Sequence, residues 1–306
     1  MARHLKPLLG NVHAHKLTPE GVRKAMRDIE AGKTAKQVKT KARGLARVKG
    51  GPMAARDCIG LLRSVLNWAV EDGLIASNPA ATIKLKASNT RDTILEGPED
   101  YKALFEAIQS LEATKQIRHA VADAVRVIAL TGARRGEVTG LCWKHVNTKS
   151  REIVLPPLAH KSGRKTGKPR VIPLPAMAAD IIARQPEGGP NDLVFQPAKG
   201  NGPLNLNQPW RKIRKAAGLP EALGLHGLRH SMASALAMGG AQASEIQAAL
   251  GHTTIAMSAK YVHWADKARA ALAEKAAAPA LAGLAQAQGN EGAEVVDLTN
   301  AKGGKK

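Results

Sequence analysis

Apolar residues recur at helical spacing along most of the chain, and this pattern predicts a mainly helical protein. Thr18–Pro19–Glu20 predicts a helix start, because a hydroxyl N-cap, a proline at the first position and an acid favour that place. This helix should run to about Glu30. Other helices are expected over residues 53–72, 98–112, 116–130, 207–217, 226–239, 243–250 and 254–260, and over an alanine-rich segment from 266 to about 286.

Three short apolar segments have the length of strands. They cover residues 152–155, 169–174 and 192–195, and a Gly- and Lys-rich connection joins the first two. The predicted fold class is therefore mainly α (α+β). We expect an N-terminal helical domain, followed by a mixed domain of helices with a small antiparallel β-sheet.

The boundary between these domains is predicted from breakers and charge. Gly73 should end a long helix, and Asn78–Pro79 forces extended backbone before a basic segment. We expect a first domain over 1–86, a linker over 87–97 and a second domain over 98–287. The Gly-, Asn- and Lys-containing tail, 288–306, is expected to be disordered.

The net charge of the 306-residue chain is +21, and its pI is about 10.2. This excess favours a polyanionic partner, although charge alone does not separate a DNA-binding protein from another basic protein. Aromatic residues make up only 3%, which favours duplex over single-stranded nucleic acid. The two cysteines indicate a reducing compartment, and no signal peptide or membrane-spanning run is present in the sequence. We expect a cytoplasmic, DNA-associated protein.

Residues 33–49 are strongly basic and contain no acid. Such a loop or helix end would repel itself unless its charges were solvated or neutralised. We favour contact with DNA; a solvated face is the alternative. The candidate contacts are Lys36, Lys39, Lys41, Arg43, Arg47 and Lys49.

Two segments combine arginine with a titratable neighbour. In Thr131–Glu137 (TGARRGE), Arg134 follows the end of an apolar helix and can hold a phosphate oxygen, or pair with Glu137 on the surface. In HGLRH, His226 and Arg229 are three residues apart and share a helical face. A capping histidine and a solvated arginine are the alternative for the second segment.

Two further segments carry a lone phenol and a run of cations. His252 follows Gly251, and Tyr261 lies nine residues later, so both can face one concave surface; packing is the alternative for the tyrosine. The tip HKSGRKTGKPR joins two predicted strands and could enter a DNA groove or remain solvated. Its candidate contacts are Lys161, Arg164, Lys165, Lys168 and Arg170.

Taken in order, these motifs resemble the tyrosine recombinases, or phage-type integrases. The family pattern is TG-x-R-x-x-E, a hairpin lysine, H-x-x-R, LGH and a nucleophilic tyrosine. This chain matches it with Arg134 and Glu137, Lys165, His226 and Arg229, His252 and Tyr261. The resemblance covers residues 98–266, and residues 4–86 resemble the family's helical core-binding domain more loosely. Lys161 is the rival to Lys165. Many integrases carry an arm-binding domain before the KPLLG-like region, and only a few residues precede it here, so the resemblance leaves arm-site DNA binding open.

The resemblance implies cleavage and rejoining of DNA through a 3′-phosphotyrosyl intermediate. Tyr261 would be the nucleophile, with His226 as candidate base. Arg134, Arg229 and His252 would stabilise the phosphate oxygens, and Lys165 would protonate the leaving 5′-oxygen. Glu137 would orient the Arg134 loop. No cofactor is expected, because arginines would serve in place of a metal and the covalent link conserves the bond energy without ATP.

The implied partners are double-stranded DNA attachment sites, a homotetramer on DNA and an accessory DNA-bending protein or excisionase. The implied role is integration or excision of a phage or genomic island. Two alternatives are a type IB topoisomerase and a DNA-binding protein without active chemistry.

Overall fold

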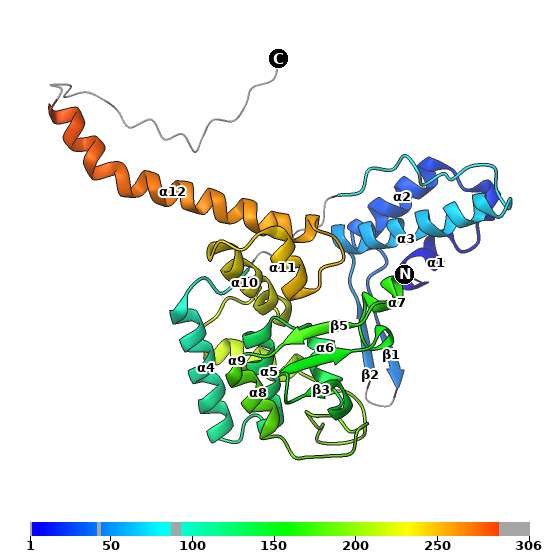
Figure 1. The fold of residues 1–306 in the computed structure, drawn as a ribbon. Coiled ribbons are helices and arrows are strands. Elements are labelled where there is room, and N and C mark those ends of the chain that lie inside the picture. Colours follow the sequence, from blue (N-terminus) through cyan, green and yellow to red (C-terminus); the bar gives the residue numbers. More distant parts are fainter. Residues whose placement is uncertain (1, 42–43, 87–92, 288–306) are drawn as a thin grey trace. The chain divides into compact units, whose positions relative to one another are not determined.

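The structure is a computed structural model, and it describes residues 2–41, 44–86 and 93–287 (Figure 1). The chain divides into two compact units, Met1–Thr90 and Arg91–Lys306, which are described separately. Among the described residues, no helix combines the length and apolar character needed to cross a membrane.

The first unit is built from helices and one β-hairpin. Thr18 caps α2, accepting a hydrogen bond from the Gly21 amide at 3.1 Å, as its position in the sequence predicts. Val22 and Ile29 of α2 pack with Ile59 of α3 in the unit's core. The elements are α1 (Ala2–Leu9), a 3-10 turn (Ala14–Lys16), α2 (Pro19–Glu30), β1 (Lys36–Lys41), β2 (Gly44–Val48) and α3 (Pro52–Glu71).

The basic segment is a hairpin, so the prediction of a loop or helix end over residues 33–49 was wrong. Strands β1 and β2 pair antiparallel, with Lys39 opposite Leu45 and Gln37 opposite Arg47. Residues directly opposite each other share a face of the hairpin, so Lys39 and Arg47 lie on the same face. Inter-strand pairing satisfies the backbone here, which depends on a partner strand and not on a local sequence pattern.

Helix α5 is central in the second unit, where it contacts α4, α6, α8 and α10 (Figure 1). A three-stranded antiparallel sheet in the order β3-β4-β5 contributes Ile153, Leu155 and Ile172 to the same core. The helices are α4 (Pro98–Ala113), α5 (His119–Thr131), α6 (Arg135–Thr139), α7 (Gly163–Thr166), α8 (Ala176–Ala183), α9 (Asn207–Ala216), α10 (Leu225–Met238), α11 (Ala243–Leu250) and α12 (Ala256–Ala287). The strands are β3 (Val146–Asn147), β4 (Glu152–Leu155) and β5 (Arg170–Pro173), and two 3-10 turns span Trp143–His145 and Pro157–Ala159.

Two predicted elements of this unit differ from the structure. The strand expected over residues 192–195 is reduced to one isolated bridge between Leu193 and Cys142, although Val194 and Phe195 are fully buried. The separate helices expected over 254–260 and from 266 form the single helix α12. Between those two ranges the sequence offers no glycine or proline, so nothing interrupts the helix.

A buried carboxylate ties α5 to α8 and the residues that follow it. Asp123 is fully buried and accepts hydrogen bonds from Arg126 (2.8 Å), Arg184 (3.0 Å from Nε) and Gln185 (2.7 Å). Burial alone would raise the pKa of Asp123, but the hydrogen bonds from Arg184, Arg126 and Gln185 outweigh it and lower that pKa.

Replacing Asp123 with alanine should lower the free energy of unfolding by about 3 kcal/mol, because it leaves charged donors without their buried acceptor. Urea unfolding followed by circular dichroism measures this loss. Asp180→Ala is the matched control, since that carboxylate lies exposed on α8. The two variants losing the same stability would show that the Asp123 network contributes little.

Candidate active site

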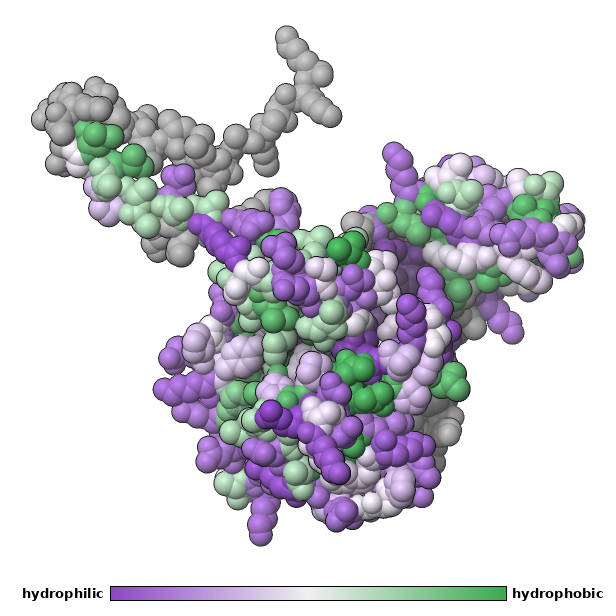
Figure 2. All heavy atoms as spheres, viewed as in Figure 1, coloured by the Kyte–Doolittle hydropathy of each residue, from purple (hydrophilic) through white to green (hydrophobic). Residues whose placement is uncertain are grey.

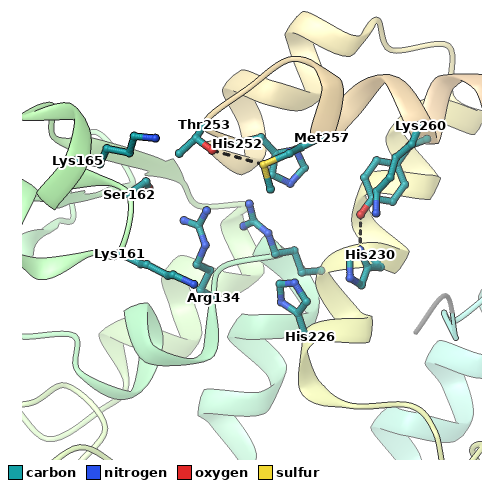
Figure 3. A pocket seen from close by; sticks show the side chains of 12 residues that line it. Arg134, Lys161, Ser162, Lys165, His226, His230, His252, Thr253, Met257 and Lys260 are labelled. Carbon is teal, nitrogen blue, oxygen red and sulfur yellow. Dashed lines mark hydrogen bonds between the residues drawn. The ribbon is translucent and has the colours of Figure 1, made fainter. Parts of the chain in front are cut away.

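The second unit contains a cavity of about 510 Å³ that gathers residues from distant parts of the sequence (Figure 3). Every residue that the sequence motifs proposed as catalytic lines it. The lining side chains are Arg134, Lys161, Ser162, Lys165, His226, Arg229, His230, His252, Thr253, Met257, Lys260 and Tyr261.

Arg134 is fixed at the point where α6 begins. Its Nη1 donates to Glu137 Oε1 at 2.8 Å, and Glu137 Oε2 accepts from the Arg134 backbone N–H at 2.9 Å. Glu137 is buried, so this double contact fixes both the backbone and the guanidinium of Arg134. The sequence left open whether Arg134 faces a phosphate or pairs with Glu137. The structure contains the ion pair, and the paired guanidinium still lines the cavity.

Two more arginines, both buried, belong to the same cluster of charges. Arg229 is 2% exposed, and its Nη1 donates to the Gly132 carbonyl at 2.8 Å. Arg170, which the sequence placed with the exposed strand connection, is 5% exposed, and its Nε lies 3.3 Å from Glu137 Oε2. Arg229 and Arg170 both donate to the Leu250 carbonyl.

The end of α11 holds all three guanidiniums. Arg134 Nη2 donates to the Gly251 carbonyl at 3.2 Å, next to the Leu250 carbonyl that the other two arginines share. Gly251 adopts φ 61°, and a Cβ there would lie 1.7 Å from Arg170 Nη1. Glycine is therefore required at this position both by the backbone conformation and by the space.

Positive charge exceeds negative charge in this cluster. Three guanidiniums, those of Arg134, Arg170 and Arg229, face the single carboxylate of Glu137. Burial, followed by the charges of Arg134 and Arg170, lowers the pKa of Arg229 to about 9, so it remains charged at neutral pH. The cluster is therefore suited to an anion such as a phosphodiester, whose charge would relieve the repulsion.

The two histidines proposed from the sequence are poor proton acceptors. Loss of solvation and the charges of Arg229 and Arg134 lower the pKa of His226. The same causes lower the pKa of His252 to about 4. His252 Nδ1 bonds Ser258 Oγ at 2.7 Å, which fixes the ring. Both side chains are therefore neutral at pH 7 and can act as hydrogen-bond partners of a phosphate.

Tyr261 lies in the second turn of α12, not at the end of a helix as the sequence indicated. It is 8% exposed, packs among residues of α10 and α11, and still lines the cavity. Its hydroxyl is hydrogen-bonded to His230 Nδ1 (Figure 3). His230 was missed in the sequence, although it lies one turn after His226 on the same face of α10, a spacing that could have revealed it.

Comparison with known proteins agrees with this geometry. Residues 97–268 match the Phage integrase family. Tyrosine recombinase XerC of Mycobacterium tuberculosis (strain ATCC 25177 / H37Ra) is 30% identical over 223 residues, which cover 68% of this chain and 72% of XerC. This chain belongs to the phage integrase family. It is accordingly a tyrosine recombinase, an enzyme of site-specific DNA recombination.

Solved integrases share its fold. A lambda integrase dimer bound to a COC′ core site has a TM-score of 0.60 and 19% identity, covering 85% of this chain and 84% of that one. The Tn1549 transposon integrase in complex with transposon right end DNA has a TM-score of 0.61 and 17% identity, covering 83% of each chain.

The lysine loop, HKSGRKTGKPR (residues 160–170), leads from β4 to β5 and folds onto the buried His160. His160 Nδ1 accepts from the Gly163 N–H at 3.1 Å, so Nε2 carries the ring proton and donates to the Lys168 carbonyl at 3.2 Å. Lys161 and Lys165 both line the cavity, and the structure leaves the choice between them open. Arg164 and Lys168 are exposed and do not line it.

The other predicted DNA contacts belong to the first unit. Lys36, Lys39, Arg47 and Lys49 are exposed on or beside the hairpin, and Lys41 ends β1. Arg43 lies outside the described residues.

One group among the described residues has donor atoms close enough to hold a metal ion: Glu112, His119 and Asp123. Its carboxylates already form ion pairs with Arg126 and Arg184, and none of the three residues lines the cavity.

The low pKa of His252 predicts that acid destabilises the recombinase. The folded pKa lies below the unfolded value, so the neutral ring's contribution is complete above pH about 6.5 and is lost as the pH falls through about 4. Between pH 7 and pH 4.5, wild type should therefore lose more stability than His252→Asn, which takes up no proton. Urea unfolding at both pH values tests this, and equal losses in the two proteins would contradict it.

Proposed function

We propose that this recombinase cleaves and rejoins double-stranded DNA through a 3′-phosphotyrosyl intermediate. The observation that carries the proposal is the convergence of one phenol and an excess of guanidinium groups on one cavity. A phosphodiester bound there would present its phosphorus to Tyr261 and its non-bridging oxygens to Arg134 and Arg229.

In cleavage, Tyr261 Oη forms a bond to phosphorus and the bond to the 5′-oxygen breaks. Negative charge grows on the non-bridging oxygens as the phosphorus becomes five-coordinate, and Arg134 and Arg229 stabilise it. Their carbonyl and carboxylate contacts fix them in advance, so little reorganisation is needed during the reaction. Neutral His252 and His226 add hydrogen bonds to the same oxygens.

The leaving 5′-oxygen requires a proton, and the lysine loop supplies it. Lys165 is the preferred donor and Lys161 the rival, because both reach the cavity from the segment that His160 holds. A second strand's 5′-hydroxyl then attacks the phosphorus and gives its proton to the same lysine. The bond from phosphorus to Tyr261 Oη breaks, which restores a phosphodiester and releases Tyr261.

The first unit would hold the duplex through its basic hairpin. Lys39 and Arg47 share one face, and the cations of this segment would displace counterions from the DNA backbone. The neighbouring folds support this assignment, since the lambda and Tn1549 integrases were solved on DNA. Arg164 and Lys168 of the lysine loop would add further phosphate contacts.

Assembly into a homotetramer would follow from strand exchange between two duplexes. A lambda integrase tetramer bound to a Holliday junction, with a TM-score of 0.59, supports it by analogy. On α12, the exposed residues Leu281 and Leu284 form part of an apolar stretch that a second copy could cover (Figure 2). Integration or excision of a phage or genomic island, with an accessory DNA-bending protein or excisionase, is the role we propose.

Tyr261→Phe should bind DNA normally and form no covalent adduct, because phenylalanine has no oxygen to bond phosphorus. The assay is a denaturing gel with a nicked duplex built from DNA that flanks the gene. Tyr101→Phe, the chain's other tyrosine, is the matched control and should retain the adduct. An adduct formed by Tyr261→Phe, or none from wild type on bound DNA, would refute the mechanism.

Lys165→Ala should slow single-turnover cleavage by roughly 100-fold or more through loss of the general acid. Replacing the bridging 5′-oxygen with sulfur should restore most of that rate, because a thiolate leaves without a proton. Lys161→Ala should have a smaller effect, and Lys149→Ala, which removes an exposed lysine outside the cavity, serves as the control. Rescue of Lys161→Ala instead would assign the proton to Lys161.

A further inference from the structure

The hydroxyl of Tyr261 has a defined partner that the family motif does not supply. Tyr261 Oη is hydrogen-bonded to His230 Nδ1, across the contact between α12 and α10 (Figure 3). The phenol ring is held by Ala233, Leu250 and Ala265 in a small apolar cluster. Because the ring is buried there, the direction of its hydroxyl toward His230 is fixed by packing.

The other two histidines of the cavity are engaged differently. His252 lies nearly parallel to the Tyr261 ring, with 6.3 Å between centroids and an interplanar angle of 16°. Its Nδ1 is paired with Ser258. His226 meets His230 edge-to-face, with centroids 4.6 Å apart, and therefore supports the His230 ring.

We propose that His230 is a catalytic residue, which takes the proton of Tyr261 during cleavage and returns it during rejoining. This inference rests on the proposed function and replaces His226 as the base suggested by the sequence. As Oη bonds to phosphorus, its proton passes to Nδ1 and the bond to the 5′-oxygen breaks. When a 5′-hydroxyl attacks, the bond from phosphorus to Oη breaks and Nδ1 gives the proton back.

Attack by a phenol on phosphorus requires a group that removes the phenol proton. A free phenol has a pKa of roughly 10, so little phenolate exists at neutral pH without help. A base in contact with the hydroxyl removes the proton as the new bond forms, and no free phenolate is needed. To accept at Nδ1, His230 carries its own hydrogen on Nε2. Lys260 Nζ, 4.8 Å from the centre of the Tyr261 ring, adds a positive charge that favours loss of the phenol proton.

The test uses His230→Asn, in which the amide can still bond the phenol but cannot take up a proton. Single-turnover cleavage of the nicked duplex should slow by on the order of 100-fold, with DNA binding and thermal unfolding unchanged. His230→Gln serves as a second variant should the first fail to fold. Cleavage within about threefold of wild type in a folded variant would overturn the proposal.

Two substrate and side-chain changes separate a base from a structural role. A 5′-bridging sulfur should rescue Lys165→Ala but not His230→Asn, because the histidine acts on the nucleophile. Fluorotyrosine can be introduced at position 261 alone in a Tyr101→Phe background, since the chain has two tyrosines. The more acidic phenol should restore part of the activity of His230→Asn. Rescue by sulfur, or an equal effect of fluorination with and without His230, would overturn the assignment.

An adduct from wild type in the same gel keeps this test distinct from the proposed function. If wild type forms the adduct and His230→Asn cleaves at the wild-type rate, the phosphotyrosyl mechanism stands and His230 is not its base.

Discussion

The rest of the site depends on the C-terminal end of α11. A helix end presents carbonyls without intrahelical partners and a partial negative charge. Here the Leu250 and Gly251 carbonyls accept from Arg170, Arg229 and Arg134, which come from a strand, a helix and a loop. The arrangement positions three like charges together without neutralising them, because carbonyls carry only partial charge. Glu137 supplies the one full negative charge, and a phosphate can supply the next.

This anchoring also sets the position of the reacting groups. His252 directly follows Gly251, and α12 begins four residues later, so the turn that positions the carbonyls also directs His252 and Tyr261 toward the cavity. The left-handed backbone at Gly251 makes that turn and leaves room for Arg170 beneath it. One backbone conformation thus couples the three arginines to Tyr261, the proposed nucleophile.

Packing of α12 against α10 adds a second constraint. Burying the Tyr261 ring costs the phenol its water, and the His230 hydrogen bond compensates for that loss. The same contact that satisfies a buried hydroxyl brings the proposed base to the proposed nucleophile.

The sequence alone determined most helices, strands β4 and β5 and the family pattern, because helical periodicity and capping are local and the motif residues keep their order and spacing. It offered the Arg134–Glu137 pair as one of two alternatives, and the structure contains that pair. Only the tertiary structure decided the features that depend on residues far apart in the sequence. Residues 36–41 and 44–48 pair through inter-strand bonds, and Arg170 is buried because α11 lies against β5. The role proposed for His230 depends on Tyr261, 31 residues away, and their contact exists only once α10 and α12 pack.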